Sequence, residues 1–396
     1  MLSVGFTYTS EDKAPVPDDH RPIRILHVVG GMNRGGIETW LMHVLRNIDR
    51  KRFQMDFLVH TNEPCAYDEE IRTLGSRIIP CLSPSRPWLY ARNFNQILRE
   101  HGPYDVVHSH VHYFSGYVLW LAKQGGVPVR IAHSHLDSSP LEAEAGWLRR
   151  LYLAGMKTSI NRNATLCLGC SQLANLDLFG HDRKANLHSQ ILYCGIDLTP
   201  FQGPIDAFDT QTELGIPADA FVVGHVGRFQ EQKNHRFLLE IFAEVFKREP
   251  QSYLLLVGEG PLRSSVEQQA SQMGLRDRII FAGSRSDIPK LMLGAMDVFL
   301  LPSLCEGLGL VLIEAQAAVL PCVLSDVIPE EADVVHPIMQ RLSLLKPANV
   351  WADAVLAASD NLSAFNKVDA LAIVEKSSFN IQMGVKRLAE VYESNI

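Results

Sequence analysis

The chain has 396 residues, of which 46% are hydrophobic and 20% charged, and this is the composition of an ordinary globular protein with room for two or three domains. Its net charge of −7 argues against nucleic acid as a partner, and no apolar run reaches the roughly 18 residues needed to cross a bilayer. The seven cysteines are odd in number and scattered, which favours a reducing, cytoplasmic location over a disulfide-bonded, secreted one.

The first half of the chain alternates between predicted strands and helices. Residues 1–20 are polar and lack the basic start and apolar core of a signal peptide, so we expect a leader outside the fold. A buried parallel strand is predicted over 23–31, "IRILHVVGG", and a helix follows from about Glu38. Cys167 and Cys170 form a lone CxxC, for which buried strand thiols are favoured over a metal or redox pair. Further strand-then-helix units are predicted at "QMDFLVH", "YDVVHSH", "VRIAHSH" and "ATLCLGCS".

The same pattern restarts near residue 200. A strand is predicted over 221–228, "FVVGHVGR", with a helix over 235–248 and later strands at "SYLLLVGEGP", "IIFAG", "DVFLLPS" and "PCVLSD". Because such alternation builds parallel sheets covered on both faces, we predict an α/β protein of two Rossmann-like domains, over 21–200 and 201–376. Ligands of open α/β sheets bind beyond the carboxyl ends of the strands, so we expect the site in the cleft between the domains.

The loop after the first strand, "GGMNRGGIE" (30–38), is glycine-rich but matches neither common phosphate-binding template. It lacks the Lys-Ser/Thr pair of a P-loop and a clean G-x-G-x-x-G, which also disfavours a dehydrogenase. Gly35 and Gly36 let backbone N–H groups approach an anion at a helix start. A plain tight turn explains the loop equally well.

The loop after the 221–228 strand, "GRFQEQKNH", carries two cations. Arg228 leaves the strand and Lys233 follows five residues later, with Asn234 suited to cap the next helix. Arginine bridges phosphate oxygens bidentately and lysine supplies a point charge, so the pair suits a diphosphate. The alternative is a solvated basic loop.

The stretch "SLCEGLGLVLIEAQAA" places two acids around a glycine turn. Glu306 lies in the predicted loop and Glu314 in the helix that follows it. The N–H groups of Gly307, Leu308 and Gly309 form an anion cradle at the positive end of that helix, and each carboxylate accepts hydrogen bonds from vicinal hydroxyls. The stretch would therefore bind hydroxyls at one end, a phosphate in the middle and hydroxyls at the other end. A sugar–diphosphate–ribose presents its groups in that order. The alternative, a capping acid and a surface acid, leaves Glu314 unexplained within an apolar helix.

Two further loops complete the set. "DVVHSHVH" (105–112) ends a strand in alternating histidines, and we favour a cleft-facing His110 that hydrogen-bonds a sugar hydroxyl, with His108 packed below it. A zinc site is the alternative, although alternate strand residues form no tight tetrahedral set. "VGEGPLR" (257–263) is glycine-rich and permits close approach of a nucleoside.

These loops, in this order, resemble family 4 of the retaining glycosyltransferases, which have the GT-B fold of two facing Rossmann-like domains. The resemblance runs from Arg24 to the C-terminus. Its most specific mark is the E-x7-E pair formed by Glu306 and Glu314. The other motifs that carry it are "GGMNRGGIE", "DVVHSH", "GIDL", "GHVGRFQEQKN", "VGEGPLR" and "PCVLSD".

The resemblance implies a transfer of a sugar from a nucleotide-diphosphate donor, with a UDP-sugar favoured, to a hydroxyl acceptor. Arg228 and Lys233 would clamp the donor diphosphate. Glu306, with the amides of Gly307 to Gly309, would hold the transferred sugar, and Glu314 would bind the ribose hydroxyls. The donor is a co-substrate, and no other cofactor is expected.

The resemblance also implies roles for other residues. Gly35 and Gly36 would meet the phosphate from the first domain, His110 would lie at the reacting sugar, and the backbone near Arg285 would face the base. No metal is expected, because the two cations and helix dipoles stabilise the leaving diphosphate instead. The acceptor hydroxyl would attack from the leaving group's own face.

Some segments depart from the family pattern or extend beyond the second domain. Val319 in "AAVLPC" stands where the family usually has a glycine turn, so a remodelled corner is expected there. "VIPEEADVV" (327–335) lacks the common glycines, which leaves the far wall of the sugar pocket open. The C-terminal segment 377–396 has amphipathic spacing and, as in the family, is expected to pack back onto the first domain.

The acceptor side is predicted on the first domain. Residues 21–200 carry a net charge of +5, whereas residues 201–396 carry −9. The first domain is therefore suited to contact with an anionic surface. Residues 146–163, "GWLRRLYLAGMKTSINRN", mix aromatic and basic side chains. Either this is a helix with a solvated basic face, or it makes peripheral contact with the inner face of a membrane, where the acceptor would be a lipid-linked sugar rather than a free glycan.

Two other functions remain open from the sequence alone. A nucleotide-sugar 2-epimerase has the same two-domain fold and needs no acceptor. A catalytically silent carbohydrate-binding or scaffold protein would be expected to have lost Glu306 or Lys233, and both are present.

Overall fold

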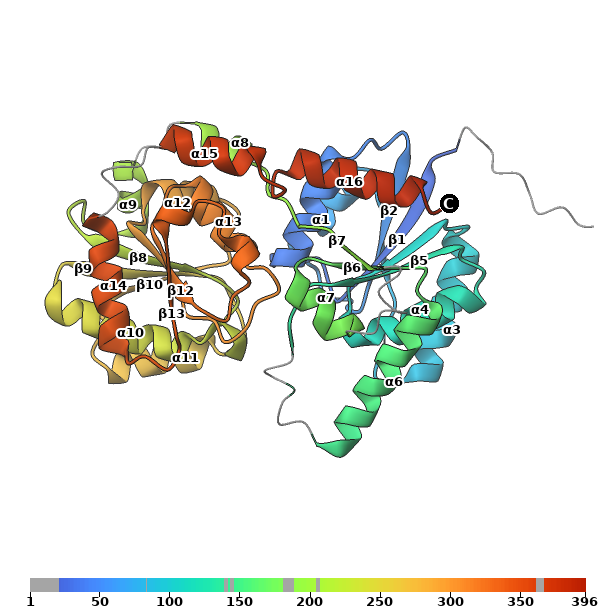
Figure 1. The fold of residues 1–396 in the computed structure, drawn as a ribbon, viewed down its shortest axis with the longest axis horizontal. Coiled ribbons are helices and arrows are strands. Elements are labelled where there is room, and N and C mark those ends of the chain that lie inside the picture. The colour runs from blue at the N-terminus through green and yellow to red at the C-terminus, as the bar shows by residue number, and fades with distance from the viewer. Residues whose placement is uncertain are drawn as a thin grey trace, which may run out of the picture.

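The computed structural model describes residues 21–396 except 83, 139–141, 143–145, 181–188, 204–206 and 361–366, so the predicted leader over 1–20 lies outside the described residues. Two α/β units stand side by side, each with one sheet between helices (Figure 1). The first sheet has seven strands in the order β3-β2-β1-β4-β5-β6-β7, and the second has six in the order β10-β9-β8-β11-β12-β13. The prediction of two Rossmann-like domains is confirmed.

All strand pairs in both sheets are parallel. The first sheet contains β1 Ile23–Val29, β2 Phe53–Val59, β3 Ile78–Pro80, β4 Val106–Ser109, β5 Val129–Ser134, β6 Leu166–Gly169 and β7 Ser189–Ile191. The second contains β8 Phe221–Val226, β9 Ser252–Val257, β10 Ile279–Gly283, β11 Val298–Leu301, β12 Cys322–Ser325 and β13 Met339–Leu342. Helices cover both faces, which is why most of the longer strands are continuous apolar runs.

The helices of the first unit are α1 Gly36–Asn47, α2 Asp68–Thr73, α3 Pro87–His101, α4 Ser115–Gln124, α6 Trp147–Asn163 and α7 Gln172–Phe179. Those that follow are α8 Thr199–Gln202, α9 Ala207–Leu214, α10 His235–Arg248, α11 Arg263–Gln272, α12 Ile288–Gly294, α13 Leu310–Ala317, α14 Ala348–Asp360, α15 Lys367–Lys376 and α16 Ile381–Glu393. None of the described helices is long and apolar enough to pass through a bilayer.

The last helix, α16, lies against α1 of the first unit (Figure 1). Its apolar stripe, which includes Leu388 and Tyr392, is buried there. Gln382 donates from Nε2 to Oδ1 of Asn47 at 2.7 Å, and the Tyr392 hydroxyl lies 2.9 Å from Nδ1 of His108. The end of the chain therefore contributes to the interior of the first unit.

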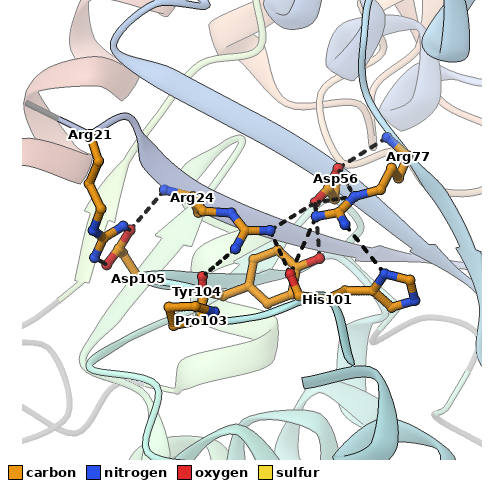
Figure 2. A network of polar contacts seen from close by, with 8 residues as sticks. All are labelled: Arg21, Arg24, Asp56, Arg77, His101, Pro103, Tyr104 and Asp105. Carbon is orange, nitrogen blue, oxygen red and sulfur yellow. Dashed lines mark hydrogen bonds and ion pairs between the residues drawn. The ribbon is translucent and has the colours of Figure 1, made fainter. Parts of the chain in front are cut away.

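A polar network ties together the amino-terminal side of the first sheet (Figure 2). Asp56 of β2 is fully buried, and its carboxylate accepts hydrogen bonds from Arg77 Nη2 at 2.6 Å and from the Tyr104 hydroxyl at 2.9 Å. Arg24 Nη2 lies 3.9 Å from the same carboxylate. The buried charge is thus compensated by two cations and a hydroxyl donor, as burial of an ion requires.

The turn after α13 adopts a glycine-like conformation at a valine. Val319 has φ +61°, its N–H donates to the Gln316 carbonyl, and the Leu320 N–H donates to the Ala315 carbonyl. This is the Schellman arrangement, which usually has glycine at that position. This corner is therefore a Schellman turn with valine at the position where glycine is usual.

We expect Val319→Gly to raise the free energy of unfolding by about 1 kcal/mol, because the left-handed conformation costs a non-glycine residue about 1–2 kcal/mol. Urea unfolding measures this as a higher midpoint at constant slope. Gly274 supplies a matched control: it has φ +71° in the same turn after α11 and open space around its Cβ position. Gly274→Val should destabilise by a similar amount. A Val319→Gly protein less stable than the original would contradict the expectation.

Candidate active site

The carboxyl ends of the two sheets face each other, and contacts join the loops that leave them. The Ser171 hydroxyl, after β6, donates to the carbonyl of Gly307, after β11. A Cβ atom on Gly307 would lie 1.9 Å from the His135 carbonyl, so only glycine fits there. The Gln172 N–H donates to Oε1 of Glu331 at 2.9 Å. The loops after β5 and β6 of the first domain therefore contact the loops after β11 and β12 of the second.

The two predicted cations both lie at this junction, and each is paired with an acid. Lys233 ends a short 3₁₀ turn, and its Nζ lies 2.5 Å from Oε1 of Glu306. Arg228 follows β8 and reaches across to the first domain, where its Nη2 lies 3.2 Å from Oε2 of Glu38. The alternative of a solvated basic loop does not hold for Lys233, whose side chain is only 15% exposed.

Glu306 is a buried and fully partnered carboxylate. It is 6% exposed, and besides Lys233 it accepts hydrogen bonds from the Ser303 hydroxyl at 2.7 Å and from Gln232 Nε2 at 3.2 Å. These donors offset the desolvation of the charge. Neither Ser303 nor Gln232 was predicted from the sequence, since their types are common in surface loops.

The turn between the two acids begins α13 as predicted. Gly309 has φ +82° and caps the helix, while Leu308 is buried. Glu314 is half-buried, and no hydrogen bond or ion pair to its carboxylate is found among the described residues. Burial raises the pKa of Glu314 to about 7. The pKa of Tyr67, raised mainly by burial, is raised further by the charge of Glu314, so this acid stands toward the first domain.

His110 lies in a buried imidazole network rather than free in the cleft. It is 6% exposed, with Nε2 at 3.0 Å from Nδ1 of His27 and Nδ1 at 2.9 Å from Nε2 of His135. His108 is likewise engaged, with Tyr392 on one side and His133 at 3.2 Å on the other. The structure differs here from our expectation of a nitrogen available to a sugar hydroxyl. A role for His110 at the reacting sugar stays a prediction.

The network arises because these histidines occupy one face of three neighbouring strands. Residues 27 and 108 are paired in register, and 110, 133 and 135 continue the same alternation. Burial lowers the pKa of His108, His110 and His133 well below the usual value, so their rings are neutral. Two sets of three have nitrogens within 4.8 Å, close enough to hold a metal ion. Ring-to-ring hydrogen bonds use most of these nitrogens, whereas Nε2 of His27 and Nε2 of His133 are buried without a partner among the described residues.

Of the remaining predicted residues, Gly35 lies beside the Arg228–Glu38 pair, and Arg285 lies after the edge strand β10. A Cβ on Gly35 would lie 2.3 Å from Arg228 Nη2, whereas Gly36, which begins α1, has open space around it. Arg285 follows β10, and its guanidinium binds Asp287 at 2.7 Å and Glu213 at 2.6 Å. Its side chain is therefore committed to neighbours, and the predicted role of its backbone at the base is untested.

Comparisons with known proteins identify the family of the chain. Residues 206–357 match the model for glycosyl transferases group 1, and residues 35–182 match a glycosyl transferase 4-like domain. The chain is 41% identical to EpsF of Bacillus subtilis (strain 168), a protein named as a glycosyltransferase, over 85% of this chain and 88% of that one. It is 25% identical to the UDP-Gal:α-D-GlcNAc-diphosphoundecaprenol α-1,3-galactosyltransferase of Escherichia coli, over 94% and 97%.

Among solved structures, HepE of Anabaena in complex with UDP-glucose superposes with a TM-score of 0.79 at 22% identity, covering 94% of this chain and 99% of that one. WaaG, a glycosyltransferase involved in lipopolysaccharide biosynthesis, gives a TM-score of 0.69 at 18% identity, covering 93% and 99%. At such identities the likeness shows the fold alone. Together with the family matches, it shows that the chain belongs to the group 1 glycosyltransferases and has the GT-B fold.

Proposed function

We propose that the protein is a retaining glycosyltransferase that moves a sugar from a UDP-sugar to a hydroxyl of a lipid-linked acceptor in polysaccharide or glycolipid synthesis. The observation that carries the proposal is the pairing of Lys233 with Glu306 between the loops after β8 and β11, with Arg228 in the first of these loops and Glu314 in the helix that follows the second. Names of relatives support the donor class, because HepE binds UDP-glucose and the E. coli enzyme uses UDP-galactose.

The donor would lie across the turn that begins α13. Arg228 and Lys233 would neutralise the diphosphate in place of a metal ion, and Glu306 would turn from Lys233 to the sugar hydroxyls. Glu314, half-buried and without a described partner, would accept hydrogen bonds from the ribose. Above about pH 7 the Glu314 carboxyl is ionised, so both of its oxygens accept hydrogen bonds. We therefore expect the affinity for the ribose to be highest above that pH.

The transfer breaks the bond between the anomeric carbon and the phosphate oxygen and forms a bond from that carbon to the acceptor oxygen on the same face. The acceptor proton passes to the departing phosphate oxygen. Lys233 and Arg228 stabilise the negative charge that develops on the diphosphate, which is where preorganised cations lower the barrier most.

Helix α6 supports an acceptor presented at a membrane. Its first half extends away from the body of the first domain (Figure 1) and exposes Trp147 by 70%, Leu148 by 65% and Leu151 by 63%. Arg149 and Arg150 lie beside them on the surface. Exposed aromatic and aliphatic side chains next to arginines suit the interface of an anionic bilayer.

We expect the double substitution Arg149→Glu/Arg150→Glu to abolish co-sedimentation with vesicles of phosphatidylglycerol and phosphatidylcholine, because it reverses two charges at the bilayer surface. Lys386→Glu/Arg387→Glu makes the same charge change on α16, where both side chains are exposed, and should bind as the original does. Equal loss in both variants, or no vesicle binding by the original protein, would contradict membrane contact through α6.

Incubation with a panel of nucleotide sugars tests the function itself. We expect UDP release from one UDP-sugar, accelerated by a short-chain GlcNAc-diphospholipid, with the product in the α configuration by NMR. Release of an epimerised sugar without acceptor would identify a 2-epimerase. Absence of turnover with donor-induced stabilisation would identify a silent binding protein.

A further inference from the structure

The pairing of Arg228 with Glu38 joins the two domains at the donor site. Glu38 lies in the first turn of α1, in the first domain, and Arg228 follows β8 in the second. Their Oε2 and Nη2 atoms are 3.2 Å apart, and the Glu38 side chain is only 12% exposed. No role for Glu38 follows from its sequence position, because an acid in the first turn of a helix is common as a partner of the helix dipole.

Gly35 lies directly beside this pairing and leaves room for it. A Cβ atom there would lie 2.3 Å from Nη2 of Arg228 and 2.4 Å from Oε2 of Glu38. Contacts under 3.0 Å are not seen for real side chains, so any other residue would push the guanidinium or the carboxylate away. The glycine in "GGIE" therefore serves the approach of Arg228 to the first domain, besides any approach of a phosphate.

The geometry leaves the rest of the guanidinium available. Glu38 contacts Nη2 alone, and no other hydrogen bond from Arg228 is found among the described residues. The Arg228 side chain is 42% exposed. A guanidinium has five N–H donors in a rigid plane, so one contact to Glu38 restrains the group and leaves other N–H donors for two phosphate oxygens.

We propose that Glu38 is a positioning residue that orients Arg228 across the cleft for the donor diphosphate. This inference rests on the proposed function. Glu38 acts only through Arg228, and by holding it against the first domain it makes donor binding depend on the closed arrangement of the two domains. The opposite arrangement, in which Glu38 competes with the diphosphate for Arg228, predicts tighter donor binding when Glu38 is removed.

A double-mutant cycle on the full-length protein tests this, with steady-state UDP release from the preferred UDP-sugar as the readout. We expect Glu38→Ala to lower kcat/KM about tenfold in the original background and to have no effect in the Arg228→Ala background, because coupled residues are non-additive. Glu38→Gln, which keeps an oxygen facing Nη2, should recover most of the loss. Glu69→Ala removes an exposed first-turn acid of α2 and serves as the control for a general helix effect.

The outcomes separate cleanly. An equal loss of kcat/KM in both backgrounds would show that Glu38 acts on the fold rather than through Arg228. An unchanged or improved kcat/KM in Glu38→Ala would show that Glu38 competes with the diphosphate for Arg228. Either result overturns the inference. Failure of the proposed function would appear instead in the original protein, as absence of turnover with every nucleotide sugar.

Discussion

Lys233→Ala is expected to lower kcat by about 10²–10³, the scale of losing one preorganised transition-state donor. The Nζ of Lys233 lies 2.5 Å from Oε1 of Glu306, which holds the cation at the proposed donor site. If Lys233 binds the diphosphate as proposed, its contribution would grow as charge develops on the leaving group, so the effect should fall on kcat more than on KM.

Stability must be measured with the same variant, because Glu306 would lose its cation. Ser303 and Gln232 still donate to Glu306, so we expect the Lys233→Ala protein to stay folded in thermal unfolding. Lys233→Arg, which keeps the charge, should retain more activity than Lys233→Ala. Lys247→Ala on the exposed surface of α10 serves as the control. Near-normal kcat in a folded Lys233→Ala protein would remove this residue from the mechanism.

Asp56→Ala is expected to lower the free energy of unfolding by about 3–5 kcal/mol, as is typical when one partner of a buried charge network is removed. The carboxylate of Asp56 is fully buried, and it is the common acceptor for Arg77 and Tyr104 and the neighbour of Arg24 (Figure 2). Without it, the Tyr104 hydroxyl would lose its acceptor, and Arg24 and Arg77 would lose their carboxylate and keep the neutral His101 carbonyl. Urea unfolding followed by circular dichroism measures the change.

The comparison for Asp56 is an exposed ion pair. Glu244 pairs with Lys247 on α10, where the lysine side chain is 67% exposed, so Glu244→Ala should change stability by less than about 1 kcal/mol. A loss below about 1 kcal/mol for Asp56→Ala as well would show that the network in Figure 2 does not contribute to folding as its geometry indicates.

Much of the fold was predictable because its long strands are apolar on both faces. Three strands were not predicted. β3 and β7 have three residues each, and β13, "MQRL", has two polar residues in four, so none of these stretches carries an apolar run long enough to stand out. Their presence depends on pairing with a neighbour already in the sheet, which is a property of the tertiary structure rather than of the segment.

The candidate site was predictable in its residue types but not in its pairings. Arg228, Lys233, Glu306 and Glu314 stand out because strand ends and helix starts are marked by glycine and proline nearby. The partner of Arg228 is 190 positions away in the other domain, and only the docking of the domains brings it close. The sequence contained a signal for the histidine network, because His27, His108 and His133 all lie in predicted strands, where alternate residues point to one face. Which of these histidines become neighbours depends on the order of the strands in the sheet.

The most direct test of donor binding by these four residues is a crystal structure of the protein soaked with UDP-glucose. We expect diphosphate oxygens at about 3 Å from Arg228 and Lys233, sugar hydroxyls on Glu306 and ribose hydroxyls on Glu314. A bound donor whose diphosphate lies away from both cations, or whose ribose leaves Glu314 facing solvent, would contradict the proposed site.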